Sequence, residues 1–254
     1  MLGDPGYGRF GNQLFTLAFA KAYADSIGAT LEIPSDWVGR IIFPHFKDYP
    51  TLSKTVPFVD FHHMPKGETN IALQGFYQNQ ESIDTWKATP YRDWFKISDN
   101  FMIPHKEVWR FVTEHYGTMP ICHIRSGDYK ETPYPILSEH TFIKAIRKYV
   151  PDYFDGIHWA FVSDGETSEP QLPQLLKGTY LDFLSDFIYM MLTPVLFRGN
   201  SSFSWWAATL AEPGQKVYSP LVQGLTNKDT ECAFAEGNWP AFLPHDEHHT
   251  DLHL

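Results

Sequence analysis

Three short segments of this chain hold residues whose types and spacing suit contact with a phosphate group. The first, Gly8-Arg9-Phe10-Gly11-Asn12, combines glycines with one cation. The second, His123-Ile124-Arg125-Ser126-Gly127-Asp128, follows an apolar run, and the third, Asn200-Ser201-Ser202-Phe203, leads into an apolar block at 205–208. A helix that begins after small polar residues offers unpaired N–H groups and partial positive charge to an anion. Asn and Ser are also ordinary helix caps, so this segment alone leaves both interpretations open.

Arg125 is the residue best suited to stabilise negative charge. It ends an apolar, strand-like run, and Gly127 leaves room for close approach to the backbone. His123 lies two residues earlier, so both side chains point to the same side of a strand. The structural alternatives are a surface ion pair of Arg125 with Asp128 and a buried, hydrogen-bonded His123. We interpret both residues as contacts to a phosphate or ribose group.

The elements that must position these residues follow from periodicity and from breakers. In the first half, helix formers at 12–27 end at Gly28, strands are expected at 30–34 and 71–77, and 79–115 is expected to be helical in two pieces broken at Pro90 and Pro104. From residue 119 strands and helices alternate. The expected strands are 119–124, 159–163, 195–199 and 217–220, and the expected helices between them include 138–149 and 181–192.

Such alternation predicts an α/β fold with a parallel, doubly wound sheet. Ligands of these sheets bind beyond the carboxyl ends of the strands. Arg125, Asp164 and Ser201 each follow such an end, so we expect them to lie together.

Composition narrows the class of protein. The chain has 254 residues, 43% of them apolar, and a net charge of −10, which disfavours binding to nucleic acid or anionic membranes. Its 2 cysteines exclude a disulfide framework. No signal peptide and no membrane-spanning apolar run is present in the sequence, so we expect a cytoplasmic protein or, alternatively, the soluble part of a membrane-anchored Golgi-type enzyme.

Five segments in the same order resemble fucosyltransferases that use GDP-fucose. Residues 8–22 resemble the glycine loop and first helix of the protein O-fucosyltransferases and of the α-1,2-fucosyltransferases (glycosyltransferase family 11-like). Residues 123–129 resemble their His-x-Arg-Arg-Gly-Asp-Tyr motif. Residues 74–78 and 181–187 resemble further segments of the α-1,2 family, and 200–210 resembles its Asn-Ser-Ser-Phe-Ser-Trp-Trp-Ala-Ala segment.

The resemblance implies a GT-B-like fold, in which two Rossmann-like domains face a cleft. It implies an acceptor-side domain over 1–116, reduced if its first strand is absent, and a nucleotide-sugar-binding domain over 117–254. The implied reaction is inverting transfer of L-fucose from GDP-fucose to a glycan hydroxyl. Arg125 is the implied catalytic residue, and the implied sugar-donor contacts are Arg9, Gly11, Asn12, His123, Asp164, Ser201, Ser202 and Phe203.

Charge on the departing diphosphate must be neutralised by a metal ion or by protein groups. The sequence has no Asp-x-Asp pair, and Asp182 and Asp186, one helical turn apart, are interpreted as capping or solvated residues. We therefore expect no metal and no cofactor, with the nucleotide sugar and a glycan acceptor as the partners. The general base stays open among Glu81, Asp128 and His63.

Two departures from the family pattern leave alternatives open. Ser126 stands where the motif has its second Arg, so the sugar donor could be another GDP-deoxyhexose or GDP-pentose, or the chain could be a catalytically inactive glycan- or nucleotide-binding homologue. No apolar strand precedes the glycine loop, which indicates a reduced first domain or a truncated chain. The sequence leaves the acceptor and the oligomeric state open.

Overall fold

The computed structural model describes residues 9–52, 58–60, 65–153, 159–165, 167, 172–222, 225–226 and 228–239. The chain divides into two compact units, Met1–Phe101 and Met102–Leu254, and each is described by itself. The expected domain boundary at 116/117 stays a prediction. Among the described residues, none of the helices combines the length and the apolar character needed to cross a lipid bilayer.

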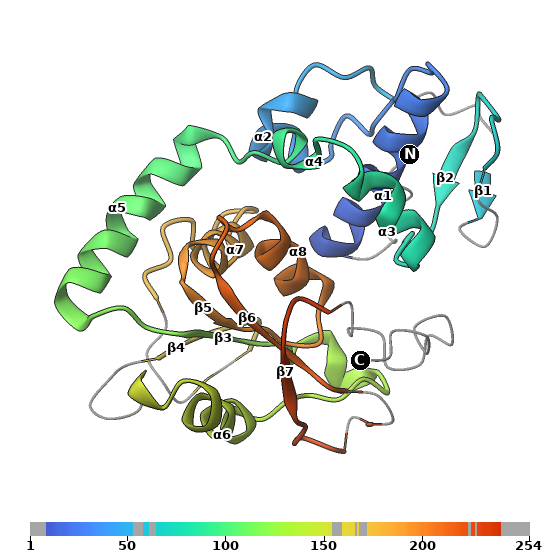
Figure 1. Cartoon of the computed structure of the whole chain (residues 1–254). Coiled ribbons are helices and arrows are strands. Elements are labelled where there is room, and N and C mark those ends of the chain that lie inside the picture. Colours follow the sequence, from blue (N-terminus) through green and yellow to red (C-terminus); the bar gives the residue numbers. More distant parts are fainter. Residues whose placement is uncertain are drawn as a thin grey trace. The chain divides into compact units, whose positions relative to one another are not determined.

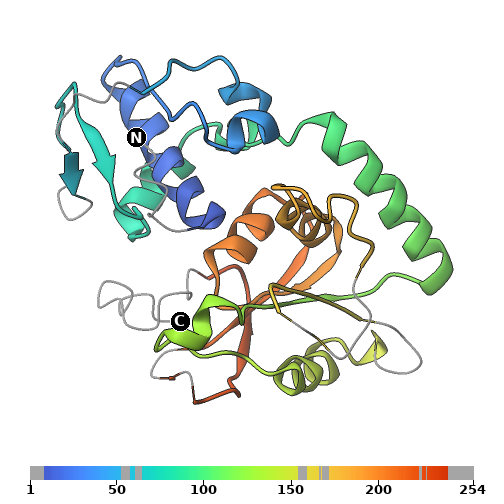
Figure 2. The same ribbon diagram turned by 180° about the vertical axis from the view of Figure 1, so that it is seen from behind.

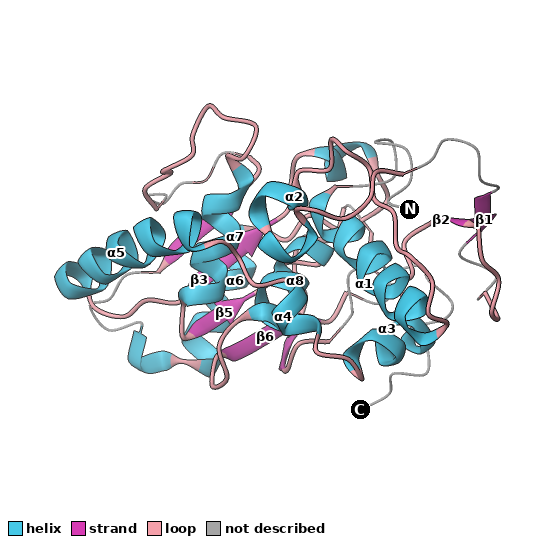
Figure 3. Cartoon of the chain, turned by 90° about the horizontal axis from the view of Figure 1, so that it is seen from above, coloured by secondary structure: helices cyan, strands magenta, loops and turns pink. Residues whose placement is uncertain are grey.

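The first unit is built around helix α1, Phe10–Ser26. Leu14, Phe15 and Phe19 of this helix are buried, and Phe19 stacks on Tyr77 with ring centroids 4.5 Å apart. Helix α3, Gln80–Lys87, packs beside α1 (Figure 3). The predicted helix at 12–27 is thus present, two residues longer at its start, and it is closed by Gly28 at a φ of 65°.

The remaining elements of the first unit are short. They are α2 (Gly39–Ile42), the 3-10 helix η1 (Pro44–Phe46), α4 (Tyr91–Trp94) and a parallel pair of strands, β1 (Phe58–Asp60) and β2 (Ala72–Gln74). The predicted strand at 71–77 is shorter than expected. The strand expected at 30–34 is wrong, because only Ile33 forms a bridge there, to Thr51.

Helix α5, Asp99–Tyr116, corrects a second prediction. Pro104 lies inside the helix and does not break it. Proline removes the hydrogen bond to the carbonyl four residues earlier, here that of Asn100. Asn100 is exposed, so water can bind the freed carbonyl. Pro90 does separate two helices, since α4 begins directly after it.

The second unit contains a five-stranded sheet in the order β4-β3-β5-β6-β7 (Figure 2). Strands β3 (Ile121–Ile124), β4 (Ala160–Ser163), β5 (Val195–Phe197) and β6 (Lys216–Pro220) run parallel, as predicted. Strand β7, Phe234–Glu236, is antiparallel to β6 and was not predicted, because three residues are too few to show an alternating pattern.

Helices cover both faces of this sheet. Helix α6, Glu139–Tyr149, lies on one face, and α7 (Phe183–Leu192) and α8 (Ser202–Leu210) lie side by side on the other (Figure 1). Under α6, Phe142 and Ile146 pack with Phe161 and Phe197 in one buried cluster. Short 3-10 helices at Asp128–Glu131 (η2) and Pro151–Tyr153 (η3) follow β3 and α6.

The chain changes direction between β3 and β5. After β3 it passes α6 to reach β4, whereas after β5 it enters α8 on the opposite face. Two neighbouring strand ends therefore send their loops to opposite faces. Doubly wound sheets bind their ligands at this kind of switch point.

Candidate phosphate-binding site

The sheet brings three predicted segments of the second unit to one edge. Arg125 directly follows β3, Asp164 directly follows β4, and the turn at Asn200 and Ser201 follows β5. Cys122 of β3 is level with Phe197 of β5. The two neighbouring strands therefore lead the Arg125 loop and the Asn200 turn to the same edge of the sheet.

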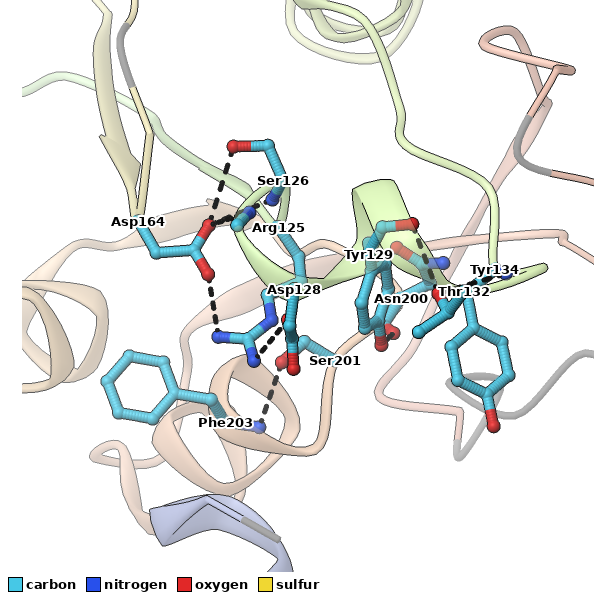
Figure 4. Close-up of polar contacts among 11 residues, drawn as sticks. Arg125, Ser126, Asp128, Tyr129, Thr132, Tyr134, Asp164, Asn200, Ser201 and Phe203 are labelled. Carbon is cyan, nitrogen blue, oxygen red and sulfur yellow. Dashed lines mark hydrogen bonds and ion pairs between the residues drawn. The ribbon is translucent and has the colours of Figure 1, made fainter.

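Arg125 is held by two carboxylates. One terminal nitrogen lies 2.8 Å from Asp128 Oδ1, and the other lies 2.9 Å from Asp164 Oδ2 (Figure 4). The guanidinium also lies 5.5 Å from the centre of the Tyr129 ring. Its side chain is 11% exposed. The ion pair with Asp128, which the sequence raised as the structural alternative, is therefore present, together with a second pair that spacing could not predict.

Asp164 fixes the loop that carries Arg125. Its Oδ1 accepts hydrogen bonds from the backbone N–H groups of Ser126 at 2.8 Å and Gly127 at 2.9 Å. Burial raises the pKa of Asp164, but these two amides and the Arg125 charge outweigh it, so the pKa lies below its ordinary value. A Cβ atom on Gly127 would lie 2.7 Å from Asp164 Oδ2, which explains the glycine. The predicted contact of Asp164 with guanine or ribose stays a prediction.

The turn after β5 is tied to the loop after β3. Tyr129 Oη donates to the carbonyl of Asn200 at 2.7 Å, and the Asn200 side chain donates to the carbonyl of Pro135 at 2.9 Å. Ser201 Oγ accepts from the backbone N–H of Phe203 at 3.3 Å and so caps α8 (Figure 4). The capping alternative for this segment is thus observed, and it places the N-terminus of a nine-residue helix at the switch point.

His123 is buried beside this turn and keeps an unused nitrogen. Its ring lies 5.8 Å from that of Phe203, and a Cβ atom on Gly199 would come within 3.0 Å of its Nδ1. Among the described residues, Nδ1 has no hydrogen-bond partner. Burial, together with the nearby Arg125 charge, lowers the pKa of His123 to about 3, so the ring is neutral. A buried ring nitrogen without a partner among the described residues is able to accept a hydrogen bond from a ligand or from water.

Asp186 was misjudged from the sequence. Asp186, expected to be a solvated or capping residue, is partly buried and accepts from Gln174 Nε2 at 2.6 Å. Burial raises its pKa to about 6, with help from the charges of Asp182 and Asp164. Asp182 does cap α7, accepting from the Phe183 N–H at 2.8 Å.

Arg198, which the sequence placed at the end of a strand without further role, is fully buried. Its Nε donates to Ser219 Oγ at 2.7 Å, and its terminal nitrogens donate to the carbonyl of Gly199 at 3.1 Å and to that of Trp239. The sequence did contain a signal, because an arginine at the end of an apolar strand must find hydrogen-bond acceptors when it is buried. The sequence could not show which residues supply those acceptors.

The predicted sugar-donor contacts Arg9, Gly11 and Asn12 lie in the first unit. Arg9 is the exposed residue before α1, Gly11 is buried within α1, and Asn12 Oδ1 accepts from Gln78 Nε2 at 2.8 Å. Their predicted contacts with the sugar donor stay predictions. Gly8 and the proposed base His63 lie outside the described residues. Glu81 and Asp128 are exposed, in the first turns of α3 and η2, and nothing distinguishes either as a base.

Comparison with known proteins gives a fold likeness. No protein-family model and no curated protein matches the sequence. The alpha-1,6-fucosyltransferase NodZ co-crystallized with GDP superposes with a TM-score of 0.52 at 15% identity, over 91% of this chain and 96% of that chain. The fucosyltransferase NodZ from Bradyrhizobium gives a TM-score of 0.52 at 15% identity, over 89% and 95%. At this identity the likeness establishes an α/β fold with a largely parallel sheet.

Proposed function

We propose that this chain is a GDP-sugar-dependent fucosyltransferase, which transfers L-fucose from GDP-fucose to a hydroxyl group of a glycan. One observation carries the proposal: Arg125 and the Ser201 turn at the start of α8 occupy neighbouring strand ends at the switch point of the sheet. The fold likeness to two structures named as fucosyltransferases, one of them crystallised with GDP, supports it. So do the five matched segments of the sequence.

In the proposed reaction GDP leaves as fucose is transferred, and negative charge grows on the β-phosphate. Arg125 neutralises that charge, and the partial positive charge at the N-terminus of α8 adds to this stabilisation. Ser202 offers a hydroxyl group, and Phe203 forms a wall with Phe183 and Phe187, whose ring centroids lie 6.2 Å and 5.1 Å from its own. The scheme uses protein cations, needs no divalent metal, and inverts the anomeric configuration.

The carboxylates around Arg125 divide their work. Asp164 is fixed by two backbone amides and keeps the guanidinium in place. Asp128 has a side chain that is 46% exposed. Because water screens an exposed ion pair, a diphosphate can displace Asp128 from Arg125 at small cost. Arg125 then bridges Asp164 and the leaving group.

The first test is substitution of Arg125. Arg125→Ala should lower kcat for fucose transfer by at least about 100-fold, since one preorganised charge-stabilising group is removed. The exposed Arg147→Ala on α6 is the control and should keep kcat. Circular dichroism and thermal unfolding confirm that both variants are folded. Wild-type turnover in folded Arg125→Ala would refute the mechanism.

The nature of the sugar donor is tested by binding. Thermal-shift measurements with GDP, UDP and several GDP-sugars should show stabilisation by GDP and GDP-fucose. Ser126 motivates two alternatives for the donor and the activity, because it stands where the family motif has an arginine. Its hydroxyl lies 3.5 Å from Asp164 Oδ1. Stronger stabilisation by another GDP-deoxyhexose or GDP-pentose would favour a different sugar. Binding without hydrolysis or transfer would favour an inactive homologue.

A further inference from the structure

Arg198 carries a charge that no carboxylate among the described residues balances. Its side chain has no exposed surface, and its three hydrogen bonds go to neutral oxygens of Ser219, Gly199 and Trp239. Among the described residues it forms no ion pair with a carboxylate, whereas Arg125 has two. Buried charges in proteins are usually paired with an opposite charge. An unbalanced one calls for a compensating anion.

The charge is retained at neutral pH. Burial lowers the pKa of Arg198 to about 9, which still leaves the guanidinium protonated. Its titratable neighbours supply no negative charge: His123 is neutral, and burial raises the pKa of Tyr129 well above its ordinary value. The N-terminus of α8 adds a further partial positive charge. Arg198 and the N-terminus of α8 therefore both present positive charge near the Gly199–Ser202 turn.

The position of Arg198 directs that charge to the turn before α8. Phe197 belongs to the cluster under α6, so Arg198, the next residue, faces the side covered by α7 and α8. The next residue, Gly199, lies against His123, because a Cβ atom on Gly199 would lie 2.7 Å from the His123 backbone oxygen. The Arg198 guanidinium donates a hydrogen bond to the carbonyl of Gly199, the first residue of the turn before α8.

Arg198 also ties together three chain segments around α8. Beyond β5 and β6, it reaches the carbonyl of Trp239 after β7. The neighbouring Asn238 donates to the carbonyl of Trp205 at 3.0 Å and to Thr209 Oγ1 at 2.9 Å, both on α8. The same network thus holds the charge in place and fixes the helix whose N-terminus faces the switch point.

We propose that Arg198 is a further positioning residue for the sugar donor: its buried charge attracts the diphosphate through the Gly199–Ser202 turn without touching it. The proposal rests on the proposed function and adds to it a second cation, which is buried next to the Gly199–Ser202 turn. It differs from the role of Arg125, which would contact the phosphate directly.

The test compares Arg198→Gln, which loses the charge, with Arg198→Lys, which keeps it. Dissociation constants are measured by calorimetry for GDP, guanosine and inorganic pyrophosphate. Arg198→Gln should weaken GDP and pyrophosphate by at least about tenfold and guanosine by less than about twofold, because only the first two carry charge. Arg198→Lys should recover most of the pyrophosphate affinity. Lys216→Gln is the control: it removes one exposed charge from the first residue of β6, at the far end of that strand from Ser219, and should change nothing.

The possible results separate the two hypotheses. Unchanged GDP and pyrophosphate binding by Arg198→Gln would overturn the role of Arg198, and so would an equal loss for guanosine, which indicates a merely structural effect. Wild-type protein that binds pyrophosphate but not GDP would overturn the proposed function alone. If Arg198→Gln does not fold, Arg198→Lys decides: pyrophosphate affinity within about threefold of wild type supports the charge, and a larger loss overturns it.

Discussion

His123 is a histidine that the fold keeps neutral, and this has a cost in acid. Its pKa is about 3 in the folded chain and 6.5 in its ordinary state, with burial as the main cause and the Arg125 charge as the second. Below pH 6.5 the unfolded chain therefore takes up a proton that the folded chain refuses. The contribution to stability is complete above pH 6.5 and is lost as the pH falls toward 3.

Substitution isolates this contribution. Between pH 7.5 and pH 5.0 the free energy of unfolding of the wild type should fall by about 2 kcal/mol more than that of His123→Asn, at about 1.4 kcal/mol per pKa unit. Urea unfolding at both pH values measures the difference. Parallel losses in the two proteins would show that His123 titrates normally, and would remove the argument that its free nitrogen waits for a ligand.

At this scale the sequence located residues better than it located partners. Arg125, Asp164 and Ser201 could be placed at one edge because strand ends were recognisable. The pairing of Arg125 with Asp164 depends on the order β4-β3, which joins residues 39 positions apart and leaves no local pattern. Arg198 was missed for the same reason, since its acceptors come from Ser219 and from Trp239, 41 residues away.

At the scale of elements, the site depends on how closely the ends of β3 and β5 approach. A Cβ atom on Gly199 would lie 2.7 Å from the backbone oxygen of His123. That oxygen belongs to the neighbouring strand, so the strand ends must separate to admit a side chain. Gly199→Ala should lower the free energy of unfolding by about 1–3 kcal/mol and weaken GDP binding.

Gly127→Ala is the matched comparison. Its Cβ would meet the Asp164 carboxylate at 2.7 Å, a side chain that can rotate away. We expect a smaller loss of stability, because no strand has to move, and a reduced kcat, because Asp164 then holds Arg125 less well. Urea unfolding and steady-state kinetics measure the two effects. An equally stable Gly199→Ala protein would contradict the close approach of β3 and β5.

Elements with a strong period were predicted well, and weak ones were not. Helix α6 begins after Ser138, as its cap predicted, and the four parallel strands lie within the predicted ranges or one residue beyond. Strand β7 and the absence of a strand at 30–34 could not be foreseen. In both, pairing to a partner far along the chain decides the structure, and the local propensity of a few residues does not.

At the scale of the whole molecule, the chain shares its fold with two solved structures to which it is only 15% identical. The proposed chemistry at that scale is free of metal ions, because a guanidinium and a helix terminus take the place of a divalent cation. Fucose transfer should therefore persist in excess EDTA. Radiolabelled transfer with and without EDTA, before and after addition of Mn²⁺, measures this. Complete loss in EDTA that manganese restores would refute the metal-free scheme.

The hydrogen bond between Arg198 and the carbonyl of Trp239 has a consequence for folding during synthesis. Arg198 is synthesised 41 residues before Trp239. Until Trp239 is added, the guanidinium lacks one hydrogen-bond acceptor, and α8 lacks the hydrogen bond from Asn238 until that residue is added. Domains generally fold as units during synthesis, but here the hydrogen bonds around Arg198 and α8 depend on residues near the end of the second unit. The network of Arg198, Asn238 and α8 can therefore close only after Trp239 has been synthesised.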